Sequence, residues 1–143
     1  VLLERREAGS ALVYVYRGSQ LEQSLGATDR RGFLVGMGYR GSGTEQMLDQ
    51  LAERLSAQSD FPHEIGVLLG YPAEDVKGFV VNEGKNYLYS GYWKVYGDLS
   101  EAKQLFYKFD RAKEALIELV SQGIGIRNVI ESCSSNLLLD GAA

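Results

Sequence analysis

The single histidine of this 143-residue chain stands beside a carboxylate, in the segment FPHEIG at positions 61–66. Histidine can act as a general acid, a general base or a metal ligand near neutral pH. If the segment is already an extended strand, His63 and Glu64 point to opposite faces and cannot form a side-chain dyad. A histidine that makes only a local hydrogen bond at the end of a strand is therefore the simpler interpretation beside the catalytic one.

Aromatic residues form a second candidate group. The stretch 85–96 contains four tyrosines and one tryptophan, together with two lysines. Such a face can stack a planar ligand, for example a flavin or a base, with a lysine near a phosphate. The alternative is a strand whose rings cover the core while the tyrosine hydroxyl groups reach water. The candidate ligand-binding residues are Lys85, Asn86, Tyr92, Trp93 and Lys94.

Metal and cofactor sites find little support in the sequence. There is no second histidine, and Cys133 is the only cysteine, so we expect no metal centre and no reactive thiol. The pattern GMGYRG at 36–41 matches a dinucleotide-binding motif, which requires a preceding strand. Here a helical segment precedes it, so we interpret the glycines as a helix end followed by a turn. No cofactor is evident.

Two short segments must position the candidate residues. The apolar run 65–69 lies between two glycines and is typical of a buried strand. Pro72 is suited to the first turn of a helix, which the apolar residues around Val76 and Phe79 extend. The residues 87–96 are aromatic and β-branched, so they predict a second strand beside the first.

The remaining elements complete a predicted α/β (or α+β) fold. The runs 1–5 and 11–17 predict an N-terminal hairpin whose second strand is interior, and periodic apolar residues predict helices within 19–55 and over 98–123. Strands joined through helices favour a small mixed, largely parallel sheet with helices packed on it. We expect one domain over 1–123 and a weakly structured C-terminal segment over 124–143.

Composition restricts the function classes. Nineteen acidic and fifteen basic side chains give a net charge of -4 without a basic stripe, so nucleic-acid binding is not favoured. No apolar run approaches the roughly 20 residues that span a bilayer, so we expect no membrane segment. A single cysteine suits a reducing compartment, and we therefore expect a cytoplasmic protein.

Several sequence words occur together and in order: FPHEIG at 61–66, GYPAEDVKGF at 70–79, GKN at 84–86 and GYWKVYGD at 91–98. With the strand at 11–17, they closely resemble a bacterial family catalogued as domain of unknown function 3793. The resemblance implies no activity. It does imply an additional N-terminal segment with a Cys-Ala-Pro-like motif ahead of this chain's start. It also implies that the gene for such a protein often lies near genes for flavodoxins and for ferrous-iron uptake, which suggests a role in redox or iron physiology.

These observations leave three functional hypotheses. The first is a non-catalytic accessory module of the bacterial cytoplasm that binds a planar small ligand or a protein partner. The second is a hydrolase or transferase in which His63 is the base and Glu64 or Asp75 assists. In that hypothesis a nucleophile comes from the upstream segment that the resemblance implies. The third is nucleic-acid binding through a positive patch around Lys85 and Lys94.

Overall fold

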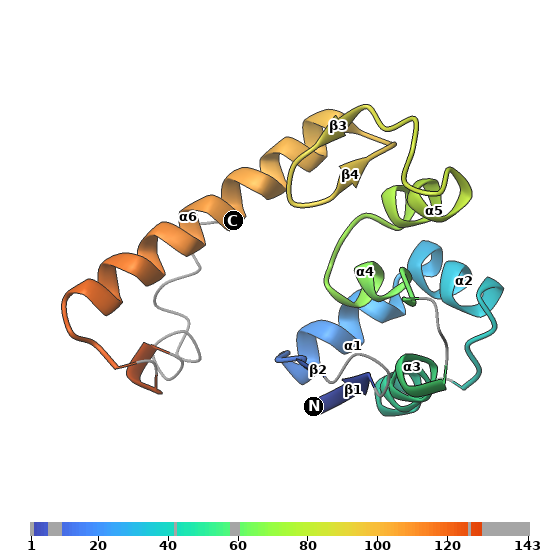
Figure 1. The fold of residues 1–143 in the computed structure, drawn as a ribbon, viewed down its shortest axis with the longest axis horizontal. Helices are drawn as coiled ribbons and strands as arrows, with labels where there is room; N and C mark the ends of the chain where they lie inside the picture. Colours follow the sequence, from blue (N-terminus) through green and yellow to red (C-terminus); the bar gives the residue numbers. More distant parts are fainter. Residues whose placement is uncertain (1, 6–9, 42, 58–60, 126, 130–143) are drawn as a thin grey trace. The chain divides into compact units, whose positions relative to one another are not determined.

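A computed structural model describes residues 2–5, 10–41, 43–57, 61–125 and 127–129. Contacts within the chain divide it into two units, Val1–Gly97 and Asp98–Ala143, which are described separately. The first unit contains β1 (Leu2–Arg5), β2 (Ser10–Val13), α1 (Gly18–Gly26), α2 (Thr28–Gly36), α3 (Thr44–Ala57), α4 (Ile65–Leu68), α5 (Ala73–Val81), β3 (Tyr89–Ser90) and β4 (Lys94–Val95) (Figure 1). The second contains α6 (Leu99–Ser121).

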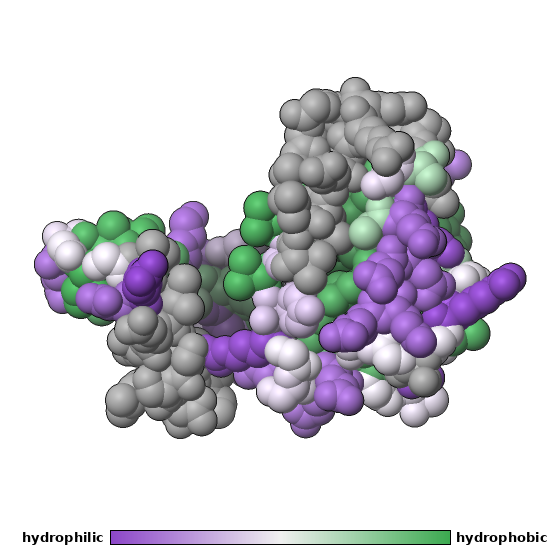
Figure 2. All heavy atoms as spheres, turned by 90° about the horizontal axis from the view of Figure 1, so that it is seen from below, coloured by the Kyte–Doolittle hydropathy of each residue, from purple (hydrophilic) through white to green (hydrophobic). Residues whose placement is uncertain are grey.

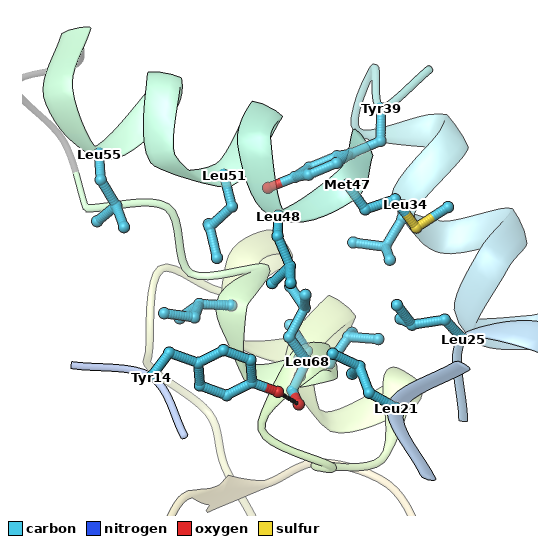
Figure 3. Close-up of a cluster of buried hydrophobic side chains, with 13 residues drawn as sticks. Tyr14, Leu21, Leu25, Leu34, Tyr39, Met47, Leu48, Leu51, Leu55 and Leu68 are labelled. Atoms are coloured by element: carbon cyan, nitrogen blue, oxygen red, sulfur yellow. Dashed lines mark hydrogen bonds between the residues drawn. The ribbon is translucent and has the colours of Figure 1, made fainter. Parts of the chain in front are cut away.

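Helices α1 to α5 build the core of the first unit. Apolar residues at three- and four-residue spacing give α3 one buried face, as the sequence predicts, and this face comprises Met47, Leu48, Leu51 and Leu55. It packs with leucines of α1, α2 and α4 into one cluster (Figure 3). Burial of these side chains is the main favourable contribution to the stability of the unit.

The sheets differ from the prediction. The expected N-terminal hairpin is present, since β1 pairs with β2 in antiparallel register from Leu2 opposite Val13 to Arg5 opposite Ser10. β3 and β4 form a second antiparallel pair. The predicted largely parallel sheet is therefore wrong: the segment at 87–96 folds back on itself at Gly91 instead of running as one strand. A Ser-Gly pair such as Ser90-Gly91 marks turns and was the signal for this hairpin.

The apolar run at 65–69 is helical and not a strand. α4 ends in a Schellman motif, in which Tyr71 N donates to Gly66 O at 2.9 Å and Gly70 N donates to Val67 O at 3.2 Å. Gly70 adopts φ +88°, a left-handed conformation that glycine accepts without steric cost. The words Gly70-Tyr71-Pro72 thus mark a helix end, and this local signal outweighs the strand-like composition of the preceding run.

The strand at 11–17 is shorter and less covered than expected. β2 ends at Val13, and Val13 and Val15 are 68% and 83% exposed, so the predicted interior strand is wrong. Tyr14 turns into the core instead. Its hydroxyl group donates a 2.5 Å hydrogen bond to Leu68 O (Figure 3), and this bond ties the hairpin to α4.

The second unit is dominated by α6. The side chain of Asp98 caps the helix as predicted, since Oδ1 accepts hydrogen bonds from Ser100 N at 2.7 Å and Glu101 N at 2.9 Å. Farther along, Ile117 and Val120 are exposed, and hydrophobic residues reach the surface near this end of α6 (left in Figure 2). Among the described residues, no helix combines the length and the apolar character needed to cross a membrane. Cys133 lies outside the described residues.

Candidate functional site

The first unit contains a pocket of about 440 Å³. Its walls are mainly apolar and come from β2, from the segment 61–71, from α5 and from the β3–β4 hairpin. Volumes of roughly 300–1,000 Å³ with few polar groups are typical of small-molecule sites. Seven ring side chains contribute to the lining: Tyr14, Phe61, His63, Tyr71, Phe79, Tyr92 and Trp93.

Trp93 is held in place by two contacts at the wall of this pocket. Its ring stacks on Tyr71, with 4.4 Å between ring centroids and 24° between the ring planes. Its Nε1 donates a 2.7 Å hydrogen bond to Asp75 Oδ2. Only 9% of Trp93 is exposed, so its ring is largely buried while it also lines the pocket.

Asp75 organises the end of the β3–β4 hairpin. The residue is 2% exposed, and its second oxygen, Oδ1, accepts hydrogen bonds from Tyr96 N at 2.7 Å and Gly97 N at 2.8 Å. With the bond from Trp93, this carboxylate accepts three hydrogen bonds. Asp75 lies at the pocket, as a candidate catalytic residue should, but its oxygens are engaged in holding β4 against α5.

His63 occupies an exposed turn before α4 and lines the pocket. Its ring lies between two phenylalanines, with centroid distances of 4.7 Å to Phe79 and 5.7 Å to Phe61. The three rings form a tilted row, with interplanar angles of 57° and 58°. Because α4 is a helix, His63 and Glu64 belong to a turn rather than to a strand end.

Glu64 faces a different part of the unit. Its Oε1 accepts hydrogen bonds from Arg54 Nη1 at 2.9 Å and from the Tyr39 hydroxyl group at 3.2 Å. Burial raises the pKa of Tyr39 above its usual value; the negative charge of Glu64 adds to the shift, whereas Arg54 opposes it. Glu64 does not line the pocket, so His63 and Glu64 belong to different surroundings. Their separation does not come from the opposite faces of a strand, because the segment is a turn.

Lys94 brings a positive charge to the pocket. Its Nζ donates a 2.6 Å hydrogen bond to Gly84 O and lies 4.8 Å from the ring centroid of Tyr87 and 5.8 Å from that of Phe79. The side chain is partly buried. The carbonyl group and the two rings fix the position of the ammonium group, and of these three neighbours Phe79 lines the pocket.

Lys85 and Asn86 belong to the turn that leads into the hairpin. Asn86 adopts φ +58°, a left-handed conformation that asparagine tolerates better than most residues. Lys85 is exposed and lies 3.7 Å from Glu83. Neither residue lines the pocket, so of the five predicted ligand-binding residues the structure brings Tyr92, Trp93 and Lys94 to it.

Phe61, Tyr71 and Phe79 line the pocket, although no motif in the sequence predicts them as ligand-binding residues. Tyr71 follows the glycine that ends α4, and this helix end was the signal that could have placed its ring outside the apolar run. Phe79 is on α5 and was interpreted only as a helix position. Burial raises the pKa of Tyr71 above its usual value.

The lining of the pocket combines large rings with several polar side chains. The described residues contain no group of three or more His, Cys, Asp or Glu side chains that could hold a metal ion. The lining residues with polar side-chain atoms are His63, Ser90, Lys94, Asp75, whose oxygens are engaged, Trp93 and the tyrosines Tyr14, Tyr71 and Tyr92. Large ring surfaces beside few polar groups bind flat apolar molecules and orient them through one or two polar contacts.

Comparisons with known proteins identify a family but no activity. The chain matches no curated protein and no solved structure. A family model described as protein of unknown function (DUF3793) matches residues 1–130, and this confirms the family that the sequence words indicate. Because the match covers most of the 143 residues, the chain belongs to the DUF3793 family.

Proposed function

We propose that this protein is a non-catalytic binding module whose pocket takes a planar small ligand. The observation that carries the proposal is the convergence of seven ring side chains from separate segments on one cavity of about 440 Å³. Two of these rings, Tyr71 and Trp93, are already stacked on each other, and stacking of this kind extends readily to a flat ligand. The volume suits a ligand of two or three fused rings.

The rigidity of the pocket wall supports this proposal. Trp93 is held by Asp75 and by Tyr71, and Tyr14 is held by its hydrogen bond to Leu68 O. Side chains that are already ordered lose little conformational entropy when a ligand binds. A wall prepared in this way favours binding over a role in which the rings only fill the core.

The catalytic alternative receives less support from the same geometry. A histidine that acts as a base is normally oriented by a third group, and Glu64 and Asp75 were the candidates for that task. Glu64 pairs with Arg54 at 2.9 Å, and Asp75 accepts three hydrogen bonds from other residues. We therefore assign His63 to the ligand-binding wall, where it extends the row of rings between Phe61 and Phe79.

We place this module in the bacterial cytoplasm as part of the same proposal. The chain has a single cysteine, which suits a compartment where disulfides do not form. Planar redox cofactors such as flavins are ligands of the shape that we propose for this pocket. This agrees with the role in redox physiology that the resemblance to the family implies. A cytoplasmic accessory role is therefore consistent with both the pocket and the composition of the chain.

A titration followed by nuclear magnetic resonance tests the proposal. Trp93 is the only tryptophan, so the indole N–H group gives one signal that reports on the pocket wall. We expect 2-naphthamide, a neutral two-ring probe, to shift this signal in a saturable manner. Tyr71→Ala removes the stacked ring and should weaken binding by about two- to tenfold, since ring pairs contribute about 0.5–1.5 kcal/mol beyond burial.

The matched control is Tyr107→Ala, which removes an exposed tyrosine of α6 in the second unit. It should leave the affinity for 2-naphthamide unchanged. If 2-naphthamide, its anionic analogue 2-naphthoate and the three-ring probe lumichrome all leave the indole signal unchanged up to their solubility limits, the pocket does not bind planar ligands and the proposal is wrong.

A further inference from the structure

We infer that the ligand of this pocket is an anion and that Lys94 is its charge partner. This inference rests on the proposed function, because it specifies the class of planar ligand that the same pocket takes. The inferred ligand is a flat ring system that carries a negatively charged substituent, such as a carboxylate or a phosphate. The ring system lies against the aromatic wall, and the substituent lies at the Lys94 side of the pocket.

The position of the Lys94 ammonium group is the first observation. An ammonium group has three N–H donors, and the hydrogen bond of 2.6 Å to Gly84 O uses one of them. This bond fixes where the charge lies, near Phe79, which also lines the pocket. Because the lysine is partly buried, its interaction with an opposite charge is screened less than it would be at an open surface.

The state of Asp75 is the second observation. A carboxylate at the pocket repels an anion most strongly when its oxygens face the ligand directly. Both oxygens of Asp75 are occupied, one by Trp93 Nε1 and the other by the backbone N–H groups of Tyr96 and Gly97. The residue is also 2% exposed, so a ligand meets the ring of Trp93 before it meets the carboxylate. Lys94 is then the charged lining residue available to select a ligand.

An aromatic pocket can also select a cation, because ring faces attract ammonium groups. Lys94 Nζ already lies 5.8 Å from the ring centroid of Phe79, which lines the pocket, and 4.8 Å from that of the neighbouring Tyr87. A second cation near these rings would be repelled by the first. The geometry therefore favours an anionic ligand over a quaternary ammonium or another cationic ligand.

Three probes with the same rings test the charge preference. They are 2-naphthoate, which is anionic, 2-naphthamide, which is neutral, and 2-naphthylmethylammonium, which is cationic. Each is titrated into the full chain while the indole signal of Trp93 is followed. We expect 2-naphthoate to bind about tenfold more tightly than 2-naphthamide, which corresponds to about 1.4 kcal/mol, and the cation to bind most weakly.

Variants of Lys94 locate the source of the preference. Lys94→Met keeps most of the length of the side chain and removes the charge, so it should abolish the preference for 2-naphthoate while 2-naphthamide binds within about twofold of its original affinity. Lys94→Arg keeps the charge and should retain most of the preference. Lys85→Met is the control, since Lys85 is exposed and does not line the pocket, and it should change neither affinity.

The outcomes separate this inference from the proposed function. Equal affinities for 2-naphthoate and 2-naphthamide, tighter binding of the cation, or loss of the preference in Lys85→Met would each overturn the inference while leaving a planar-ligand site. If none of the three probes binds, the proposed function fails as well. If Lys94→Met does not fold, a salt titration of the original protein takes its place. Rising salt concentration should weaken the binding of 2-naphthoate and leave the binding of 2-naphthamide unchanged. A salt-independent affinity for 2-naphthoate would then overturn the inference.

Discussion

Replacement of Asp75 tests whether a buried carboxylate builds the pocket wall. This side chain accepts hydrogen bonds of 2.7 Å, 2.7 Å and 2.8 Å from Trp93 Nε1, Tyr96 N and Gly97 N. Asp75→Ala leaves these three donors without their acceptor. A buried donor without a partner costs about 1–3 kcal/mol. Water can reach the backbone groups, so we count the full penalty for Trp93 and about half for each of the others.

This count gives an expected loss of about 2–6 kcal/mol in the free energy of unfolding for Asp75→Ala. Typical domains are stable by only about 5–15 kcal/mol, so the loss is large. Asp75→Asn is the sharper variant. Its amide oxygen can still accept the two backbone hydrogen bonds, but its NH₂ group then faces the indole N–H of Trp93. One hydrogen bond is lost and two donors oppose each other, for about 1–3 kcal/mol.

Urea unfolding followed by far-ultraviolet circular dichroism measures these losses, and the indole N–H signal of Trp93 reports the hydrogen bond directly. Asp49→Asn makes the same chemical change at an exposed position of α3 and should stay within about 0.5 kcal/mol of the original protein. Trp93→Phe removes the opposing donor, so the cost of Asp75→Asn should fall in that background. If Asp75→Asn is as stable as Asp49→Asn, Asp75 does not organise the wall and the reasoning is refuted.

Two further predictions concern the core. Burial and the charge of Glu64 raise the pKa of Tyr39 above its unfolded value of 10.0, so the folded state keeps its proton longer than the unfolded state. The contribution of this shift to the free energy of unfolding is complete below pH 10 and should decrease as the pH rises above 10. Urea unfolding at pH 9 to 11 should show a smaller decrease for Tyr39→Phe than for the original protein. An equally steep decrease in both proteins would contradict this prediction. A Cβ at Gly78 would lie 2.4 Å from Tyr96 Cγ, so Gly78→Ala should destabilise by about 1–3 kcal/mol in thermal unfolding. At Gly32 a Cβ meets nothing within 4 Å, and Gly32→Ala should stabilise α2 by about 0.5–1 kcal/mol; the same sign at both glycines would refute the packing argument.

The sequence by itself determined the elements that local chemistry specifies. The buried face of α3 follows from apolar residues at helical spacing, and the start of α6 follows from Asp98, which caps its own neighbours. The start of α5 follows from Pro72, and the N-terminal hairpin follows from two apolar runs around a polar turn. The sequence words also determined the family. Each of these signals lies within a few residues of the structure that it predicts.

Only the tertiary structure decided the state of 65–69 and the roles of the carboxylates. A short apolar run has the same composition in a buried strand and in a buried helix, and the helix end at Gly70 and the hydrogen bond from Tyr14 select the helix here. Likewise, a carboxylate in a sequence does not reveal its partners. Asp75 meets donors 18 to 22 residues away, and Glu64 meets Arg54 across the core. Hydrogen bonds and ion pairs between distant residues exist only once the chain is packed, so they leave no periodic pattern in the sequence.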